Sequence, residues 1–114
     1  MSAKMTAKDP DAVEPYFVVW CSKSGTNANT AADTGELKGA TIATSTWVVP
    51  TGITKDSDDT GAITIAGISY GVDTVATVWL SGGEAGEEYT LTNRITTSDG
   101  RTLDQSIVVP VKEL

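Results

Sequence analysis

The clearest alternation of apolar and polar residues lies in the last quarter of the chain, residues 88–111. Every second residue of its first run is suited to one buried face: Tyr89, Leu91, Asn93 and Ile95. This period of two is typical of a strand with one buried and one solvated face. A second run rich in valine, residues 103–111, follows the pair Asp99-Gly100, which readily accepts positive φ in a tight turn. The sequence therefore predicts a β-hairpin, with Pro110 at a sheet edge or near a strand end.

Four more stretches have the composition of strands, and a fifth is weaker. They are Tyr16–Cys21, Ala40–Val49, Ala62–Tyr70 and Thr74–Leu80, with a shorter candidate around Ile53-Thr54. In the second stretch, Ile42 and Trp47 share a face only if the strand contains a bulge, because an odd number of positions separates them. We therefore expect the odd-numbered residues from Thr41 to Trp47 to share one face instead. Between strands, Ser22–Gly39 is expected to be a long loop and the acidic Lys55–Gly61 a turn.

About seven strands at spacings near ten residues, with no convincing helix, are typical of an immunoglobulin-like β-sandwich. One local feature supports this class. Tyr89 would begin the penultimate strand, where the hydroxyl of a tyrosine bonds back across the preceding corner. The apolar residue two positions later, Leu91, would then enter the core.

The N-terminal residues are polar, and two prolines preceded by acidic residues discourage a helix there. We expect a flexible N-terminal arm over residues 1–14. Residues 15–114 would form a single antiparallel immunoglobulin-like β-sandwich domain, which fits a chain of 114 residues.

The charge balance excludes several classes of partner. The chain has a formal net charge of −7 and a pI of about 4.3, so phosphate backbones and anionic lipid surfaces repel it. No apolar run approaches the roughly twenty residues that span a bilayer, and the N-terminus has no apolar secretory segment. We therefore predict no nucleic-acid and no membrane partner. A single cysteine, Cys21, cannot form an intrachain disulfide, which fits synthesis in a reducing cytoplasm.

The sequence offers no catalytic constellation. It contains no histidine, which excludes histidine-based general bases, Ser-His-Asp triads and histidine metal sites. Cys21 ends an apolar strand and is interpreted as a structural thiol. The glutamates of the Ser81–Glu88 region are interpreted as a solvated acidic rim, because no cleft separates their environments. We predict a protein that is not an enzyme and has no cofactor.

Two further features were weighed as binding sites. Asp56–Gly61 resembles the first half of a calcium loop, but its twelfth position would be Gly67, where a glutamate is required. An acidic turn is the better interpretation, and no metal site is predicted. The three tryptophans, at positions 20, 47 and 79, could stack on sugars if exposed, but their apolar strands favour packing in a core or interface.

Several segments resemble a known family. They are Lys8–Asp11, Thr46–Pro50, Val78–Gly83, Ala85-Gly86, Tyr89–Thr97 and Gly100–Thr102. Together they are similar to small virion structural proteins of tailed bacteriophages, described as fibre-tail or head-tail adaptors with an immunoglobulin-like sandwich. The resemblance implies a non-enzymatic virion protein at the neck or tail, made in the host cytoplasm and present in multiple copies. Its implied partners are portal, tail, fibre or capsid subunits and other copies of itself in a symmetric ring or array.

The expected contact residues lie in the arm, the long loop and the hairpin turn: Lys8, Asp9, Pro10, Asn27, Asn29, Asp99 and Arg101. Two alternative functions remain open at this point. One is a capsid decoration protein that staples the outer shell. The other is a carbohydrate-binding β-sandwich module, which requires an exposed, coplanar pair of tryptophan or tyrosine side chains.

Overall fold

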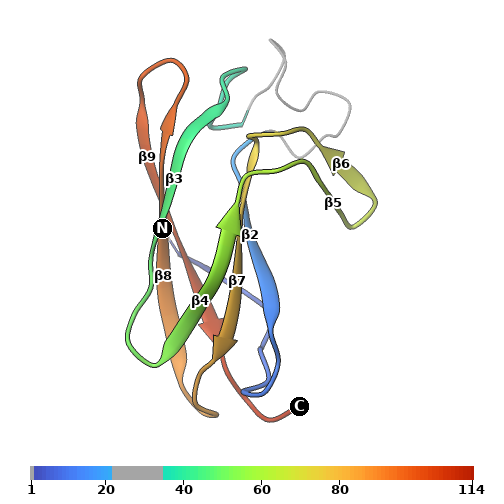
Figure 1. The fold of residues 1–114 in the computed structure, drawn as a ribbon, viewed down its shortest axis with the longest axis vertical. Coiled ribbons are helices and arrows are strands. Elements are labelled where there is room, and N and C mark those ends of the chain that lie inside the picture. Colours follow the sequence, from blue (N-terminus) through green and yellow to red (C-terminus); the bar gives the residue numbers. More distant parts are fainter. Residues whose placement is uncertain (1, 22–34) are drawn as a thin grey trace.

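The structure, a computed structural model, describes residues 2–21 and 35–114, and these residues form strands and turns without a helix (Figure 1). The strands are β1 (Ser2–Lys4), β2 (Glu14–Val19), β3 (Ile42–Val48), β4 (Ile53–Asp59), β5 (Ile63–Ile65), β6 (Ile68–Tyr70), β7 (Val75–Gly82), β8 (Glu88–Thr97) and β9 (Thr102–Pro110). The all-β class predicted from the sequence is confirmed.

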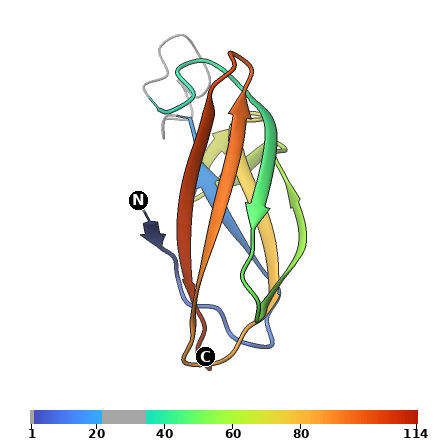
Figure 2. The same ribbon diagram turned by 90° about the vertical axis from the view of Figure 1, so that its left-hand side faces the viewer.

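Two sheets lie face to face and enclose the core (Figures 1 and 2). One sheet has the order β1-β9-β8-β3 and the other β2-β7-β4, while β5 and β6 form a separate two-stranded hairpin. All pairings are antiparallel except that of β1, which runs parallel to β9. This is the strand order of an immunoglobulin-like sandwich, in which the second, fourth and fifth main strands face the third, sixth and seventh.

The C-terminal hairpin is present as predicted. β8 and β9 pair in continuous register from Glu88↔Pro110 to Thr96↔Thr102. At the turn, the N–H of Thr97 donates to the carbonyl of Arg101 at 2.8 Å. Positive φ falls on Gly100, at 90°, and not on its neighbour Asp99. A type I turn closed by a glycine is one of the common longer hairpin connections.

The tyrosine at the start of β8 also behaves as predicted. The hydroxyl of Tyr89 accepts a hydrogen bond of 3.0 Å from the backbone N–H of Glu84, five residues earlier. Leu91, two positions later, is completely buried. The contact fixes the corner between β7 and β8, as in other sandwiches of this class.

β4 corrects one prediction. The acidic segment expected to be a turn from Lys55 to Gly61 is instead extended as far as Asp59 and pairs with β7. Ile53 is the one fully buried residue of this strand. β4 is the last strand of its sheet, and charged side chains, which are common on edge strands, leave no apolar alternation to mark it in the sequence.

The stretch Ala62–Tyr70, predicted to be one strand, is two. Ala66 and Gly67 have φ values of 51° and 82°, and they reverse the chain between β5 and β6. A pair of residues with positive φ is the geometry of a tight hairpin turn. Isoleucines of this hairpin pack against the core. The apolar alternation therefore reflects the packing of a hairpin and not of one continuous strand.

A bulge in β3 places Ile42 and Trp47 on the same face of the strand. The register with β8 shifts between Ile42 and Thr44, and consequently Ile42 and Trp47 are both buried. The expectation that the odd-numbered residues alone share the inner face was wrong. The extra residue of a bulge changes the parity of the strand.

The N-terminal segment lies against the last strand. The N–H of Met5 donates to the carbonyl of Val108 at 2.8 Å, and that of Lys8 to the carbonyl of Pro110 at 2.9 Å. The residues expected to form a flexible arm are therefore hydrogen bonded along the edge of β9. The domain boundary at residue 14 stays a prediction.

Candidate functional site

The expected contact residues that the structure describes lie at opposite ends of the long axis of the molecule. Lys8, Asp9 and Pro10 lie at the end that carries the C-terminus, the lower end in Figure 1. Asp99 and Arg101 lie in the turn between β8 and β9 at the upper end (Figure 1). The two remaining candidates, Asn27 and Asn29, fall outside the described residues.

Lys8 is completely buried, which is unusual for a lysine. Its ammonium donates to the carbonyl of Asp9 at 2.9 Å and to the carbonyl of Gly82, at the end of β7, at 2.8 Å. Burial lowers the pKa of Lys8, although the nearby carboxylates of Asp9 and Glu14 oppose that shift. The ammonium therefore binds this chain's own backbone and joins the N-terminal segment to the end of β7.

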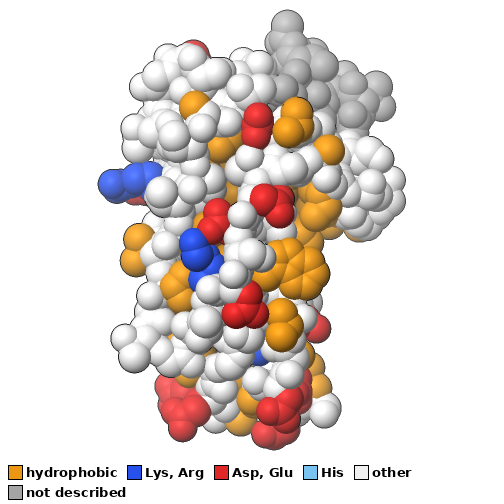
Figure 3. All heavy atoms as spheres, in the orientation of Figure 1, with side chains coloured by type: hydrophobic (Ala, Val, Ile, Leu, Met, Phe, Trp, Pro, Cys, Tyr) orange, Lys and Arg blue, Asp and Glu red, His pale blue; other side chains and the backbone are white. Residues whose placement is uncertain are grey.

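The segment after Lys8 is held against the C-terminus. The carboxylate of Asp9 accepts hydrogen bonds from the N–H of Leu114 at 3.1 Å and the N–H of Asp11 at 3.0 Å. These two bonds lower the pKa of Asp9. Figure 3 shows acidic side chains gathered at this end of the molecule. The exposed acidic residues of the segments that meet here are Asp11, Glu84, Glu87 and Glu113. The lower end is thus hydrogen bonded to the sandwich and negatively charged.

The upper end is organised by Arg101. Its Nε lies 3.1 Å from both carboxylate oxygens of Asp99, and its two terminal nitrogens donate to the carbonyls of Glu36 and Leu37, each at 2.7 Å. Leu37 is completely buried. Hydrogen bonds from the Thr97 hydroxyl and from Arg101 lower the pKa of Asp99. The arginine therefore fixes the turn Gly35–Gly39 beside the hairpin turn.

The prediction that the tryptophans pack in a core or an interface is confirmed for the core at positions 20 and 47 and stays a prediction for Trp79. Trp20 and Trp47 are buried, but Trp79 is 39% exposed on the outer face of the sheet β2-β7-β4. Both faces of β7 carry apolar residues, so alternation alone could not identify the solvated one. Its nearest cross-strand neighbours, Pro15 and Ser57, are small.

The carbohydrate-binding alternative needs two exposed, coplanar aromatic rings. All three tyrosines, at positions 16, 70 and 89, are buried, and so are two of the three tryptophans. Trp79 therefore has no exposed tryptophan or tyrosine beside it. The arrangement does not favour a sugar-stacking platform.

Other candidate chemistry has no support in the geometry. Cys21 is buried, as expected of a structural thiol. Residues 56–59 are extended within β4 and do not curl as a calcium loop does. Within residues 2–21 and 35–114, no group of three or more histidine, cysteine, aspartate or glutamate side chains could hold a metal ion. The same residues include no helix of the length and apolarity that a membrane span requires.

These features define an immunoglobulin-like β-sandwich with hydrogen-bonded segments at both ends of its long axis. Comparison with protein families identifies the particular group. Residues 8–110 match the family described as "Podophage GP4 fiber-tail adaptor protein gp77", and the chain belongs to that family. Comparison with curated proteins finds no significant match.

Family membership confirms the class of function that the sequence resemblance implied. The protein is a structural adaptor of the phage tail, hence a virion component, and its family is not one of enzymes. Other virion proteins are its partners, because an adaptor between fibre and tail must bind both. The capsid-decoration alternative has no comparable support.

Proposed function

We propose that this protein joins fibre to tail by using its two ends, with several copies arranged symmetrically around the tail. The observation that carries the proposal is the position of the two candidate contact groups at opposite ends of β9. Asp9 and Pro10 lie beside the end of this strand, and Asp99 and Arg101 lie beside its beginning.

The distance between the ends suits an adaptor. Nine residues of extended chain, Thr102–Pro110, span roughly 30 Å at about 3.3 Å per residue. Two partners can therefore bind opposite ends without contacting each other. At both ends a buried or ion-paired side chain, Lys8 or Arg101, binds backbone carbonyls of a neighbouring segment, which favours a fixed spacing between the ends. A rigid spacer holds one partner at a fixed orientation to the other.

Charge gives the lower end a preferred kind of partner. Its exposed carboxylates favour a basic surface, and they disfavour contact between the lower ends of two copies. Neighbouring copies in a ring would thus meet along their sides and not at this end. Closed rings of identical subunits are the usual outcome when a heterologous contact repeats around an axis.

The first experiment is to determine the location and copy number of the protein in purified particles. Quantitative mass spectrometry against the major capsid protein would give the number, and immunogold electron microscopy the location. A few to a few dozen copies at one vertex or along the tail are expected. Hundreds of copies over the shell would instead identify a decoration protein, and absence from particles would overturn the proposal.

A second experiment separates the two ends. Ala85→Trp places a bulky side chain on the exposed turn at the lower end, and Thr102→Trp places one at the start of β9. Each variant should lose one contact and keep the other. We expect one variant to remain on tails that lack fibres, and the other to be absent from tails. If both variants lose both contacts, the two partners do not bind opposite ends.

A further inference from the structure

β2 is an edge strand with little protection beyond Pro15 near its start. It pairs with β7 on one side, and no strand in the described part of the chain pairs with its other side. The other edges are blunted: β9 is covered by β1 over Ser106–Val108, β3 has a bulge, and β4 has a bulge and four charged residues. β2 is regular, and its one charged residue, Glu14, is its first. Natural sheets seldom leave such an edge unprotected unless it binds something.

The backbone of β2 presents hydrogen-bonding groups to the open side. The N–H of Trp20 donates to the carbonyl of Thr74, on the β7 side, at 3.1 Å. Because the direction of N–H and C=O alternates along a strand, those of Phe17 and Val19 face away from β7. An added strand would find two donors and two acceptors there. Pro15 has no N–H, so the usable edge begins at Tyr16.

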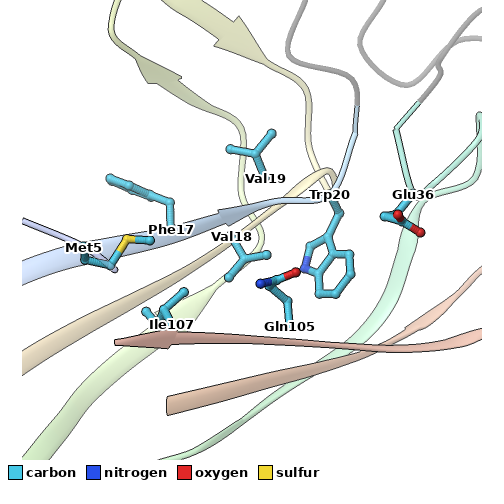
Figure 4. Close-up of a pocket in the computed structure, with 8 residues that line it drawn as sticks. All are labelled: Met5, Phe17, Val18, Val19, Trp20, Glu36, Gln105 and Ile107. Atoms are coloured by element: carbon cyan, nitrogen blue, oxygen red, sulfur yellow. The ribbon is translucent and has the colours of Figure 1, made fainter. Parts of the chain in front are cut away.

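A groove of about 330 Å³ runs beside this edge (Figure 4). Val18 and Trp20 point toward Gln105 and Ile107 of β9, while Phe17 and Val19 project from the opposite side of β2. The groove exists because β1 covers only part of β9, after which the chain crosses to the lower end before it enters β2. Its volume suits a few apolar side chains and not a whole element.

The groove carries a single charge. Glu36 is the one charged residue among the described residues that line it, and it is exposed. Its backbone carbonyl is held by Arg101, so the position of the residue is fixed. A basic segment is the favoured occupant, because the exposed carboxylate of Glu36 and the net charge of −7 both attract positive charge.

We propose that the open edge of β2 and the adjoining groove bind an extended, positively charged segment of another virion protein. The segment adds a strand to β2 through Phe17 and Val19, and its alternate apolar side chains fill the groove. A lysine or arginine of the segment lies near Glu36. This inference rests on the proposed function, since it identifies the side of the adaptor that captures one of its partners.

The test uses a photo-crosslinking side chain in assembled particles. Benzoylphenylalanine replaces Phe17 beside the groove, and in a control it replaces Val48, which is exposed on the edge strand β3. After irradiation of purified particles, mass spectrometry identifies the attached peptide. We expect position 17 to crosslink to a basic segment with alternating apolar residues in another virion protein, and position 48 not to crosslink to it.

Three outcomes would overturn the inference, and they are distinguishable. Attachment of position 17 to a second copy of this chain would identify a self-association surface. Crosslinking of position 17 only to its own chain, in particles that contain the protein, would contradict the docking site. It would not contradict the proposed adaptor function. Absence of the unmodified protein from particles would overturn both proposals.

Matched substitutions measure the contribution of the edge. Val19→Lys adds a charge that repels a basic segment, and Val48→Lys makes the same change on β3. Val19→Pro removes an outward N–H while the pairing with β7 is kept. Thermal unfolding shows whether each variant folds. Binding is then measured with a synthetic copy of the crosslinked peptide. Both changes at Val19 should weaken the affinity for this peptide by about tenfold or more. Equal binding by the Val19 and Val48 variants would contradict the inference.

Discussion

The indole N–H of Trp20 donates a hydrogen bond of 2.9 Å to the side-chain carbonyl of Asn93 and so connects the two sheets inside the core. Asn93 is completely buried on β8. Its amide nitrogen donates to the hydroxyl of Ser45 at 2.9 Å and to the carbonyl of Thr46 at 3.0 Å. One amide therefore links the end of β2 to both β8 and β3. Such a buried polar group is stabilising only while all of its partners are present.

Replacement of Asn93 by leucine should lower the free energy of unfolding by about 2–4 kcal/mol. Leucine has a similar size, but it leaves the N–H of Trp20 and the carbonyl of Thr46 without this partner. Urea unfolding followed by tryptophan fluorescence measures the effect. Thr90→Leu, at an exposed position of the same strand, is the control and should change stability by less than about 0.5 kcal/mol. Equal stability of the two variants would contradict the role of the network.

Alanine substitutions at two glycines between β7 and β8 distinguish the cost of backbone strain from the cost of steric crowding. Gly83 and Gly86 have nearly the same φ, 95° and 92°. A methyl group on Gly83 would lie 2.8 Å from Cγ2 of Val111, whereas one on Gly86 would meet nothing within 4 Å. Both alanine variants should lose the roughly 1–2 kcal/mol expected of a side chain in this region. Gly83→Ala should lose about 1–3 kcal/mol more, from overpacking.

Chemical denaturation of the two variants measures that difference. Val111→Ala in the Gly83→Ala background should recover part of it, because the methyl group that clashes is then absent. The same second change in the Gly86→Ala background should only destabilise. Equal losses for the two glycine variants would show that Val111 moves away at no cost.

The C-terminal half of the fold could be predicted because its signals are local. β8 has one buried and one solvated face, so its alternation identifies the buried side, including that of Asn93. The corner at Tyr89 depends on a partner only five residues away. Hairpin pairing needs no knowledge of the rest of the chain, and this is why residues 88–111 matched their prediction.

The errors arose where the environment of a residue depends on distant elements. β4 is solvated along most of its length because no strand follows it in the sheet, and its sequence is therefore as polar as that of a turn. Trp79 lies on the solvated face of its sheet, although both faces of β7 carry apolar residues. Neither the pairing of β4 nor the exposure of Trp79 can be predicted from the local pattern of residues.

The hydrogen-bond partners of the candidate contact residues could not be predicted either, because they are distant in sequence. Lys8 was expected at a surface, but the carbonyl that holds its ammonium belongs to Gly82, far away in sequence. Arg101 reaches back to Glu36 and Leu37. The sequence identified the two ends of the molecule that these residues occupy, but not the backbone groups to which their charges are bound.

Lys8→Met tests whether the buried ammonium holds the N-terminal segment in place. Methionine keeps the apolar stem but removes the donor to the carbonyls of Asp9 and Gly82, which should lower the free energy of unfolding by about 1–3 kcal/mol. Amide hydrogen exchange should also quicken at Lys112, whose N–H donates to the carbonyl of Lys8 at 3.0 Å.

Lys4→Met is the matched control for the buried lysine. Lys4 lies in the same segment, but its ammonium makes an exposed ion pair with Glu88 at 2.8 Å. Exposed pairs of this kind contribute little, so this variant should lose no more than about 1 kcal/mol. A Lys8→Met protein as stable as the control would mean that the ammonium does not contribute and that the other hydrogen bonds of the segment hold it in place.

Acid should destabilise the protein through carboxylates whose pKa is lowered in the folded state. The pKa of Asp99 lies below its ordinary 3.8 because Thr97 and Arg101 donate hydrogen bonds to the ionised form. The pKa values of Asp9 and Asp104 are lowered in the same direction. In the unfolded chain these groups take up protons first, so stability is fully present above about pH 4 to 5 and is lost as the pH falls through the lowered values.

Thr97→Val should weaken this acid sensitivity at Asp99. The change removes the hydroxyl that donates to the carboxylate, so the pKa of Asp99 should rise toward its ordinary value. The side-chain carboxyl carbon of Asp99, followed by NMR between pH 6 and pH 2, reports that pKa directly. Thr96→Val is the control, because the hydroxyl of Thr96 contacts Thr44 across the strands and not Asp99. If both variants leave the titration of Asp99 unchanged, Arg101 alone lowers its pKa, and Arg101→Gln should then raise it.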